Sequence, residues 1–314
     1  MGISHYIKEI GRGARGAKAI DREQAADLFG QVLDQAVTDL EIGAFCLAMR
    51  IKGETAAEMA GFIDATHARL APVEAAGALP LVVLPSYNGA RRLPVLTPLL
   101  ALLLAREGLP VLLHGMRTEA RRILASDVLE ALGIAPLAAP RAVADGEVAH
   151  IATGLLHPGL ARLLKVREVV GLRNPGHSVT KLVTPATAPS LVVTAYTHPE
   201  YFDTLCATFA LRGMNALLSR GLEGEVVADP RRTPRYDAFV GGVHRLLEEQ
   251  QPGTLGEVPG LPTGIDVQAT ADYTRRVLDG RAPLPPALAR QVAHIVHLSR
   301  EITASGSLRN KTAP

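Results

Sequence analysis

Apolar and polar positions in the first 72 residues repeat with the period of an α-helix. Asp21 is a suitable N-cap for a helix whose apolar side chains share one face, at Ala25, Leu28, Phe29, Val32 and Leu33. Similar spacing over residues 38–49 and 55–69 predicts two further helices. Residues 1–72 are therefore predicted to form a small all-helical domain.

The pattern changes after Pro72 to short, continuous apolar runs that alternate with helical segments. We predict strands over residues 79–84, 110–114, 190–196 and 216–219, and helices over residues 93–106, 121–132, 199–211, 266–279 and 284–303. The order strand, loop, helix, strand is typical of a parallel sheet, and continuous apolar strands indicate cover on both faces. The Gly- and Pro-rich region 221–265 is predicted to be irregular. The fold class is therefore α/β, with an α/β domain over residues 73–314, while part of the basic helical segment at about 155–185 joins the helical domain.

Composition supports a packed protein without a membrane segment. Apolar residues make up 47% and charged residues 20% of the 314 positions, and the formal net charge is only +2. The longest apolar run, 95–105, contains Pro98 and is shorter than the roughly 20 residues that a membrane span requires. The N-terminus lacks the apolar stretch of a signal peptide. We expect a soluble cytoplasmic protein, and the ten histidines show no metal-ligand spacing.

Three loops that follow predicted strands carry candidate chemistry. The first, residues 85–92, contains Ser86, the turn pair Asn88-Gly89 and the pair Arg91-Arg92, so backbone amides and two cations would face one anion. The second is the segment 114–117, and the third is the Gly-rich turn 221–225. Because parallel strands end at one edge of a sheet, the three loops are expected to meet there. Ordinary surface turns with solvated arginines remain the alternative for each loop.

The order of these motifs resembles the anthranilate phosphoribosyltransferase family over nearly the whole chain. His114, Gly115 and Arg117 match the family's KHGNR loop, Ser126 its SSD helix start, and Arg167 its VRKxLGxRT segment. The resemblance implies a helical domain joined to a larger α/β domain, a homodimer formed through the helical domain, and a site for phosphoribosyl diphosphate and magnesium. It implies one phosphate or ligand site, which we predict to be vestigial, at Ser86, Asn88, Gly89, Arg91, His114, Gly115, Arg117, Ser126, Arg167 and Glu225.

Departures from the family motifs argue against an ordinary transferase. The segment 86–90 replaces the family's GTGGD, Leu113 replaces a lysine, and Met116 replaces an asparagine. Of the family's magnesium-binding Asp-Glu pair, only Glu225 follows the turn. Magnesium that bridges a diphosphate requires well-placed carboxylates, so the sequence predicts a weakened metal site.

Other strings resemble a YbiB-like subgroup of this fold. These strings are KEIGRG at 8–13, PSYNGAR at 85–91, GLRN at 171–174 and HPEY at 198–201. The resemblance implies a homodimer that binds nucleic acid with little sequence preference. Clustered basic residues are the electrostatic footprint of such binding, and the predicted phosphate contacts are Lys8, Arg12, Arg15, Lys18, Arg167, Arg173 and Lys181.

The sequence therefore predicts a protein that binds DNA or RNA and has a transferase-like scaffold with degenerate catalytic motifs. That hypothesis requires no cofactor and no metal. The alternative is a glycosyl or phosphoribosyl transferase that acts with phosphoribosyl diphosphate and Mg²⁺. In that case Asn88, His114, Arg117, Arg167 and Glu225 would line the site. A third hypothesis is a sensor whose phosphorylated ligand controls a nucleic-acid site.

Overall fold

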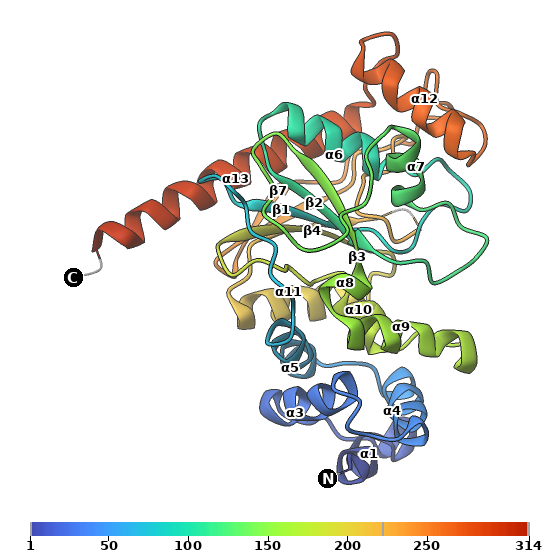
Figure 1. The fold of residues 1–314 in the computed structure, drawn as a ribbon, viewed down its shortest axis with the longest axis vertical. Coiled ribbons are helices and arrows are strands. Elements are labelled where there is room, and N and C mark those ends of the chain that lie inside the picture. Colours follow the sequence, from blue (N-terminus) through green and yellow to red (C-terminus); the bar gives the residue numbers. More distant parts are fainter. Residues whose placement is uncertain (1, 222, 313–314) are drawn as a thin grey trace.

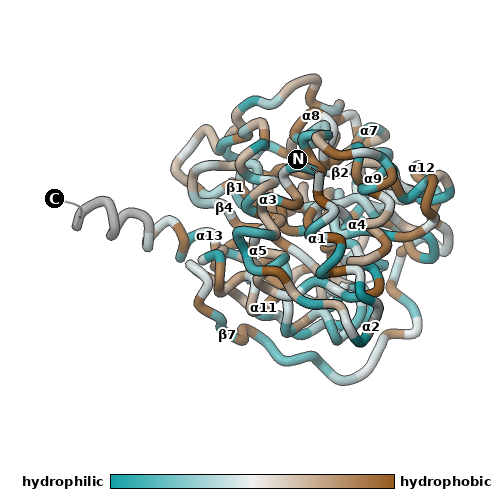
Figure 2. The backbone as a smooth tube through the Cα atoms, turned by 90° about the horizontal axis from the view of Figure 1, so that it is seen from below, coloured by the Kyte–Doolittle hydropathy of each residue, from teal (hydrophilic) through white to brown (hydrophobic). Residues whose placement is uncertain are grey.

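The N-terminal part of the chain is a layer of helices below the sheet (Figures 1 and 2). The computed structural model describes residues 2–221 and 223–312, except the side chains at 14 and 306–312. The layer consists of α1 (Ser4–Ile10), α2 (Gly13–Gly16), α3 (Arg22–Leu33), α4 (Asp39–Lys52) and α5 (Ala56–His67). Asp21, Thr38 and Thr55 each close a capping box at the start of the three longer helices, which satisfies backbone donors there.

A seven-stranded sheet forms the second part, with strand order β3-β2-β1-β4-β5-β6-β7. Its strands are β1 (Leu81–Pro85), β2 (Val111–Gly115), β3 (Val148–Ala152), β4 (Ser190–Tyr196), β5 (Ala216–Arg220), β6 (Tyr236–Val240) and β7 (Val243–Glu248). The first five strands pair in parallel, and β6 and β7 add an antiparallel hairpin. The predicted mainly parallel α/β fold with a helical N-terminal domain is confirmed.

The expectation that residues 221–265 are irregular is wrong in part, because this region contains β6 and β7. Asp237, the second residue of β6, is completely buried, which a local apolar pattern does not predict. Arg235, just before β6, and His244 of β7 bind its carboxylate, so the buried acid has its polar partners.

Helices cover both faces of the sheet, and the sheet separates two main cores. One core contains Val82, Leu84 and Leu191 of the sheet and packs against α6 (Thr97–Arg106), α7 (Ala125–Ala131), α12 (Val267–Leu278) and α13 (Pro286–Thr312). The other core contains Val192 and Leu218 and continues through α11 (Tyr201–Arg212) into the helical layer. Continuous burial on both faces explains why the parallel strands are uniformly apolar.

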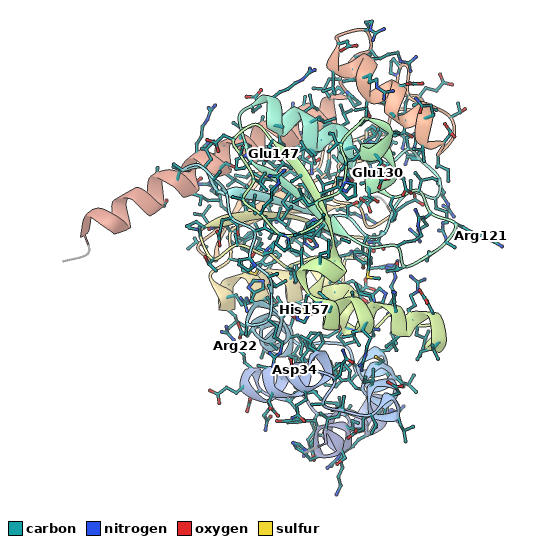
Figure 3. The ribbon with its side chains drawn as sticks, in the orientation of Figure 1. Arg22, Asp34, Arg121, Glu130, Glu147 and His157 are labelled. Carbon is teal, nitrogen blue, oxygen red and sulfur yellow. The ribbon has the colours of Figure 1, made fainter. Side chains whose placement is uncertain are left out.

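Three helices lie between the helical layer and the sheet: α8 (Thr153–Leu156), α9 (Pro158–Val170) and α10 (Pro175–Val179). Figure 3 shows His157, the N-cap of α9, between Asp34 of the helical layer and the sheet. This is the segment that was expected to join the helical domain. No helix within the described residues has the length and apolar character needed to cross a membrane.

Candidate functional site

The loop after β1, residues 85–92, lies at the carboxyl edge of the parallel strands, as the sequence predicts. We call it the β1 loop. It packs directly on the end of β2, where the Ser86 amide donates to the His114 carbonyl at 2.9 Å. A Cβ atom on Gly115 would lie 2.0 Å from the Ser86 carbonyl oxygen. Only glycine allows the two loops to approach this closely.

The donors of the β1 loop bind a carboxylate of the protein itself. Glu225 is 4% exposed. It accepts hydrogen bonds from the Ser86 hydroxyl at 2.6 Å, the Gly89 amide at 2.7 Å and the Thr97 hydroxyl at 2.8 Å. The carboxylate of Glu225 thus takes the hydrogen-bond donors that the sequence assigned to an external anion, and a phosphate in this loop stays a prediction.

A second glutamate occupies the outer half of the same loop. One oxygen of Glu223 accepts from the Arg91 amide at 2.9 Å and the Arg92 amide at 3.1 Å. The backbone of Glu223 has a φ of 55°, a conformation that is costly for any residue other than glycine. The side-chain Nδ2 of Asn88 donates to the carbonyl of the next residue, Gly224, at 3.0 Å. The segment Glu223–Glu225 thus takes up the amides that an external phosphate would use.

Three arginines converge beside this loop on a single acid, Glu119. Arg122 and Arg167 bind its two oxygens at 2.9 and 2.7 Å, and Arg173 lies 3.9 Å away. Burial raises the pKa of Glu119, but hydrogen bonds from Arg122 and Arg167 outweigh it and leave the pKa below its usual range. Arg173 also donates to the Asn88 side-chain oxygen at 2.8 Å, which connects the cluster to the β1 loop.

A cavity of about 470 Å³ opens between the helical layer and the sheet, next to the β1 loop. We call it the interdomain cavity, and its charged and aromatic lining includes Arg50, Glu54, Tyr87, Arg173, His177 and Lys181. A volume of this size suits a small metabolite, and cavities between domains at a sheet edge are common ligand sites.

The lining of the interdomain cavity contains three basic side chains, Arg50, Arg173 and Lys181, and two acidic ones, Glu54 and Glu200, so cations are in excess. Burial, with Arg173 nearby, lowers the pKa of Lys181 to about 8, so its ammonium is largely charged at neutral pH. Burial also lowers the pKa of His177 to about 3, which leaves that imidazole neutral. Glu54 also lines this cavity, and burial raises the pKa of its carboxyl.

Comparison with known proteins agrees with this geometry. Residues 4–69 match the helical bundle domain of the glycosyl transferase family. The chain is 30% identical over 271 residues to the anthranilate phosphoribosyltransferase of Streptomyces griseus, covering 84% of this chain and 75% of that protein. The chain belongs to the anthranilate phosphoribosyltransferase family. It is also 38% identical over 299 residues to the "Uncharacterized protein YbiB" of Escherichia coli (strain K12), covering 93% of both chains.

The fold comparison extends to solved structures of the family. The anthranilate phosphoribosyltransferase of Thermus thermophilus superimposes with a TM-score of 0.72 at 23% identity. The match covers 95% of this chain and 89% of that one, so it includes both the helical layer and the sheet.

Within this family fold, the predicted site residues separate into groups. Ser86, Asn88, Gly89 and Glu225 meet directly, and Arg167 joins them through Glu119 and Arg173. Arg91 contributes its amide, while its side chain is 60% exposed. The group is therefore a real constellation, held together by its own carboxylates.

Three predicted members lie outside that constellation. His114 points to the Val183 carbonyl at 3.1 Å, and burial lowers the pKa of its imidazole to about 4. Arg117 binds both oxygens of Asp127 at 2.8 and 2.7 Å. Ser126 lies one residue before that aspartate, in the first turn of α7.

The two glutamates do not provide a magnesium site in this arrangement. Glu225 directs its oxygens to three hydrogen-bond donors, and Glu223 directs one oxygen to two more. Across the described residues, no group of three or more His, Cys, Asp or Glu side chains is placed to hold a metal ion. The residues present do not fit Mg²⁺ while the β1 loop binds Glu223–Glu225.

The seven predicted nucleic-acid contacts occupy two separate places. Arg167, Arg173 and Lys181 are partly buried near the β1 loop and the interdomain cavity. The other four are exposed in and next to α1 and α2, at Lys8, Arg12, Arg15 and Lys18. The sequence analysis missed Glu119, although it is the one acid among Arg117, Arg121 and Arg122. Arg121 itself extends away from the body (Figure 3).

Proposed function

We propose that this chain is a pentosyltransferase of the phosphoribosyl class whose anionic substrate occupies the interdomain cavity. The observation that carries the proposal is the cavity itself, which places Arg173 and Lys181 beside the β1 loop and between the two parts of the fold. Family membership supports this class of ligand. An anthranilate phosphoribosyltransferase is 30% identical over most of the chain.

The occupied β1 loop limits when transfer takes place. A diphosphate requires the amides of Gly89, Arg91 and Arg92, and Glu223–Glu225 already bind them. Substrate binding in the cavity and diphosphate binding in the β1 loop are therefore separate events. We propose transfer only for a state in which the two glutamates have left the loop.

Thermal unfolding with phosphoribosyl diphosphate, with and without Mg²⁺, tests this function. A ligand at about 100 times its dissociation constant raises the free energy of unfolding by about 2.7 kcal/mol. We expect a stabilisation that saturates with concentration, and its loss in Lys181→Met. Glu147→Gln is a matched control because Glu147 pairs with Arg141, away from both cavity and loop. No stabilisation of the unmodified protein, or an equal one in Lys181→Met, contradicts the proposal.

A second candidate function is nucleic-acid binding, as the sequence analysis predicts. The observation that favours it is the exposed cluster of Lys8, Arg12, Arg15 and Lys18. Arg12 pairs with Glu9 at 2.8 Å, and the described residues contain no ion pair to the other three. Free cations on one surface release counterions when they bind phosphates, so the affinity would fall with salt. A binding constant for single-stranded DNA that does not change with salt excludes this candidate.

We also propose that two copies pair through the helical layer. Leu40, Leu47 and Ile51 of α4 are 84%, 47% and 55% exposed. Their spacing of seven and then four residues places them on one face of the helix. An exposed apolar stripe of this kind is typical of a surface that another chain covers.

A further inference from the structure

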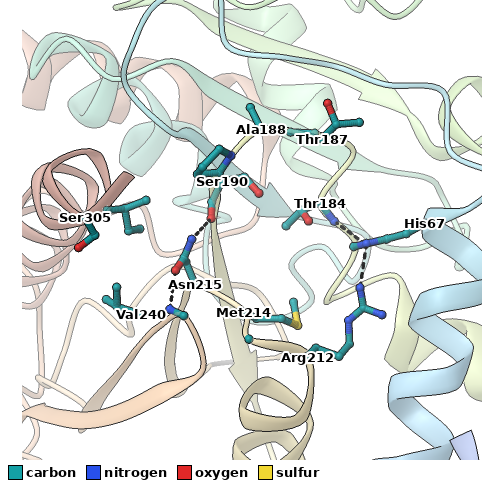
Figure 4. A pocket seen from close by; sticks show the side chains of 15 residues that line it. His67, Thr184, Thr187, Ala188, Ser190, Arg212, Met214, Asn215, Val240 and Ser305 are labelled. Carbon is teal, nitrogen blue, oxygen red and sulfur yellow. Dashed lines mark hydrogen bonds between the residues drawn. The ribbon is translucent and has the colours of Figure 1, made fainter. Parts of the chain in front are cut away.

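A second cavity, of about 380 Å³, lies at the opposite edge of the sheet from the β1 loop. Figure 4 shows its lining, which comes from the end of α5, the segment leading into β4, the α11–β5 loop, the β6–β7 turn and α13. The proposed transfer site uses none of these residues. We call this space the amino-edge cavity, since β4 and β5 begin there.

Hydrogen-bond donors exceed acceptors on one wall of the amino-edge cavity. Arg212 Nη2 lies 3.2 Å from His67 Nδ1, and the Thr184 amide lies 3.4 Å from His67 Nε2, as the dashed lines in Figure 4 show. A guanidinium and a backbone amide only donate. A neutral imidazole has one N–H and one accepting nitrogen. At least one N–H on this wall therefore faces another N–H.

The protonation state of His67 does not remove the mismatch. Burial, and then the charge of Arg212, lowers the pKa of His67 to about 4. The ring is thus neutral at physiological pH, and a protonated ring would add a further donor. Arg212 Nε is also buried without a hydrogen-bond partner in the described structure.

The acids near this wall do not supply the missing acceptor. Asp64 binds Arg212 and is shared with Arg22 on the side of the helical layer. Glu74, at the rim, already accepts from the Thr187 amide, the Thr187 hydroxyl and the Ala188 amide. Arg212 is the one ionised side chain among the lining residues, all of which the structure describes. The wall therefore has unmet capacity for an acceptor with negative charge.

We propose that the amino-edge cavity binds a small oxyanion, either inorganic phosphate or the phosphate or carboxylate group of a metabolite. Its oxygens accept from Arg212, from the His67 ring N–H and from the Thr184 amide. Apolar side chains elsewhere in the lining accommodate an organic body, at Met214, Val240 and Ile302. Because His67 belongs to α5 and Arg212 to α11, the bound anion connects the helical layer with the sheet.

Titration with inorganic phosphate, followed by the imidazole resonances of His67, tests this site. We expect a saturable shift in the unmodified protein, and binding at least about tenfold weaker in Arg212→Met, which loses charge-assisted hydrogen bonds. Arg141→Met is the matched control, because Arg141 forms an exposed ion pair elsewhere. Lys181→Met, in the interdomain cavity, should leave the His67 shift unchanged, which separates this site from the proposed transfer site.

Two further arms complete the experiment. Ser305→Phe fills the amino-edge cavity from α13 without changing the ion pairs, and it should abolish binding. This second variant keeps the test decisive if Arg212→Met does not fold. Acetate and ribose 5-phosphate, in place of inorganic phosphate, distinguish a carboxylate from a phosphate ligand. The absence of a saturable His67 shift with all three probes, or an unchanged affinity in a folded Arg212→Met or Ser305→Phe protein, overturns the proposal.

Discussion

Replacing Glu225 by glutamine should open the β1 loop to an external diphosphate. Glu225 accepts three hydrogen bonds, from Ser86, Gly89 and Thr97. Glutamine keeps the shape, and the two hydroxyls are able to turn and accept from its amide. The bonds then lose their charge assistance, at about 1 kcal/mol each. The occupied state of the loop is weakened by up to about 3 kcal/mol, which corresponds to about 100-fold in an equilibrium constant.

Calorimetric titration with inorganic pyrophosphate measures this effect directly. If Glu225 competes with pyrophosphate for the β1 loop, weakening its bonds to the loop raises the apparent affinity for pyrophosphate by the same factor. The expected gain in Glu225→Gln is up to about 100-fold. Glu223→Gln is the comparison. It weakens two bonds at the loop rim, so its gain should be smaller. A folded Glu225→Gln protein that binds pyrophosphate no tighter than the unmodified protein refutes the competition.

Other outcomes follow from the same contacts. Phosphate binding in the interdomain cavity should weaken as the pH rises through about 8, because Lys181 then loses its proton, and calorimetry at several pH values would detect this. The pKa of Lys181 is about 8 in the folded protein and 10.5 in the unfolded chain, so between pH 8 and 10.5 the unfolded chain binds more protons. The contribution of Lys181 to the free energy of unfolding should therefore rise with pH over this range. Tyr87→Phe removes the 2.9 Å hydrogen bond to the His177 carbonyl and should cost about 1 kcal/mol in urea unfolding. If the second candidate function holds, Lys8→Ala should reduce the salt slope of DNA binding by about 1. Leu47→Glu should give monomers in light scattering if α4 pairs two copies.

The sequence predicts the strands well where a run of apolar residues corresponds to burial on both faces of the sheet. Runs of Val and Leu predict β1, β2, β4 and β5, because strands covered on both faces need no alternation. The strand β3 was missed, since its sequence VAHIA has two alanines, which favour a helix, and no such run. The hairpin β6–β7 was missed because its buried charge is satisfied partly from the neighbouring strand, which local patterns do not reveal.

The sequence likewise predicted some features of the candidate site and missed others. Turn chemistry correctly indicated that the amides of residues 85–92 turn toward one place. That the loop binds an external anion stays a prediction, because these amides and the Ser86 hydroxyl bind Glu223 and Glu225 of the same chain. The sequence also brought the turn 221–225 to this loop, although the two lie more than 130 positions apart in the chain. It did not predict that Glu223 and Glu225 would themselves accept the hydrogen bonds of the loop. Charge clustering likewise grouped Arg167 with Lys8. The fold separates them, since Arg167 is bound by Glu119 and Lys8 faces solvent.

A crystal structure determined with inorganic phosphate would test the central claim most directly. The account predicts an anion in the interdomain cavity beside Arg173 and Lys181, with Glu225 still bound to Ser86, Gly89 and Thr97. Phosphate on the Gly89 and Arg91 amides of the unmodified protein, with the glutamates displaced and the cavity empty of anion, would contradict it.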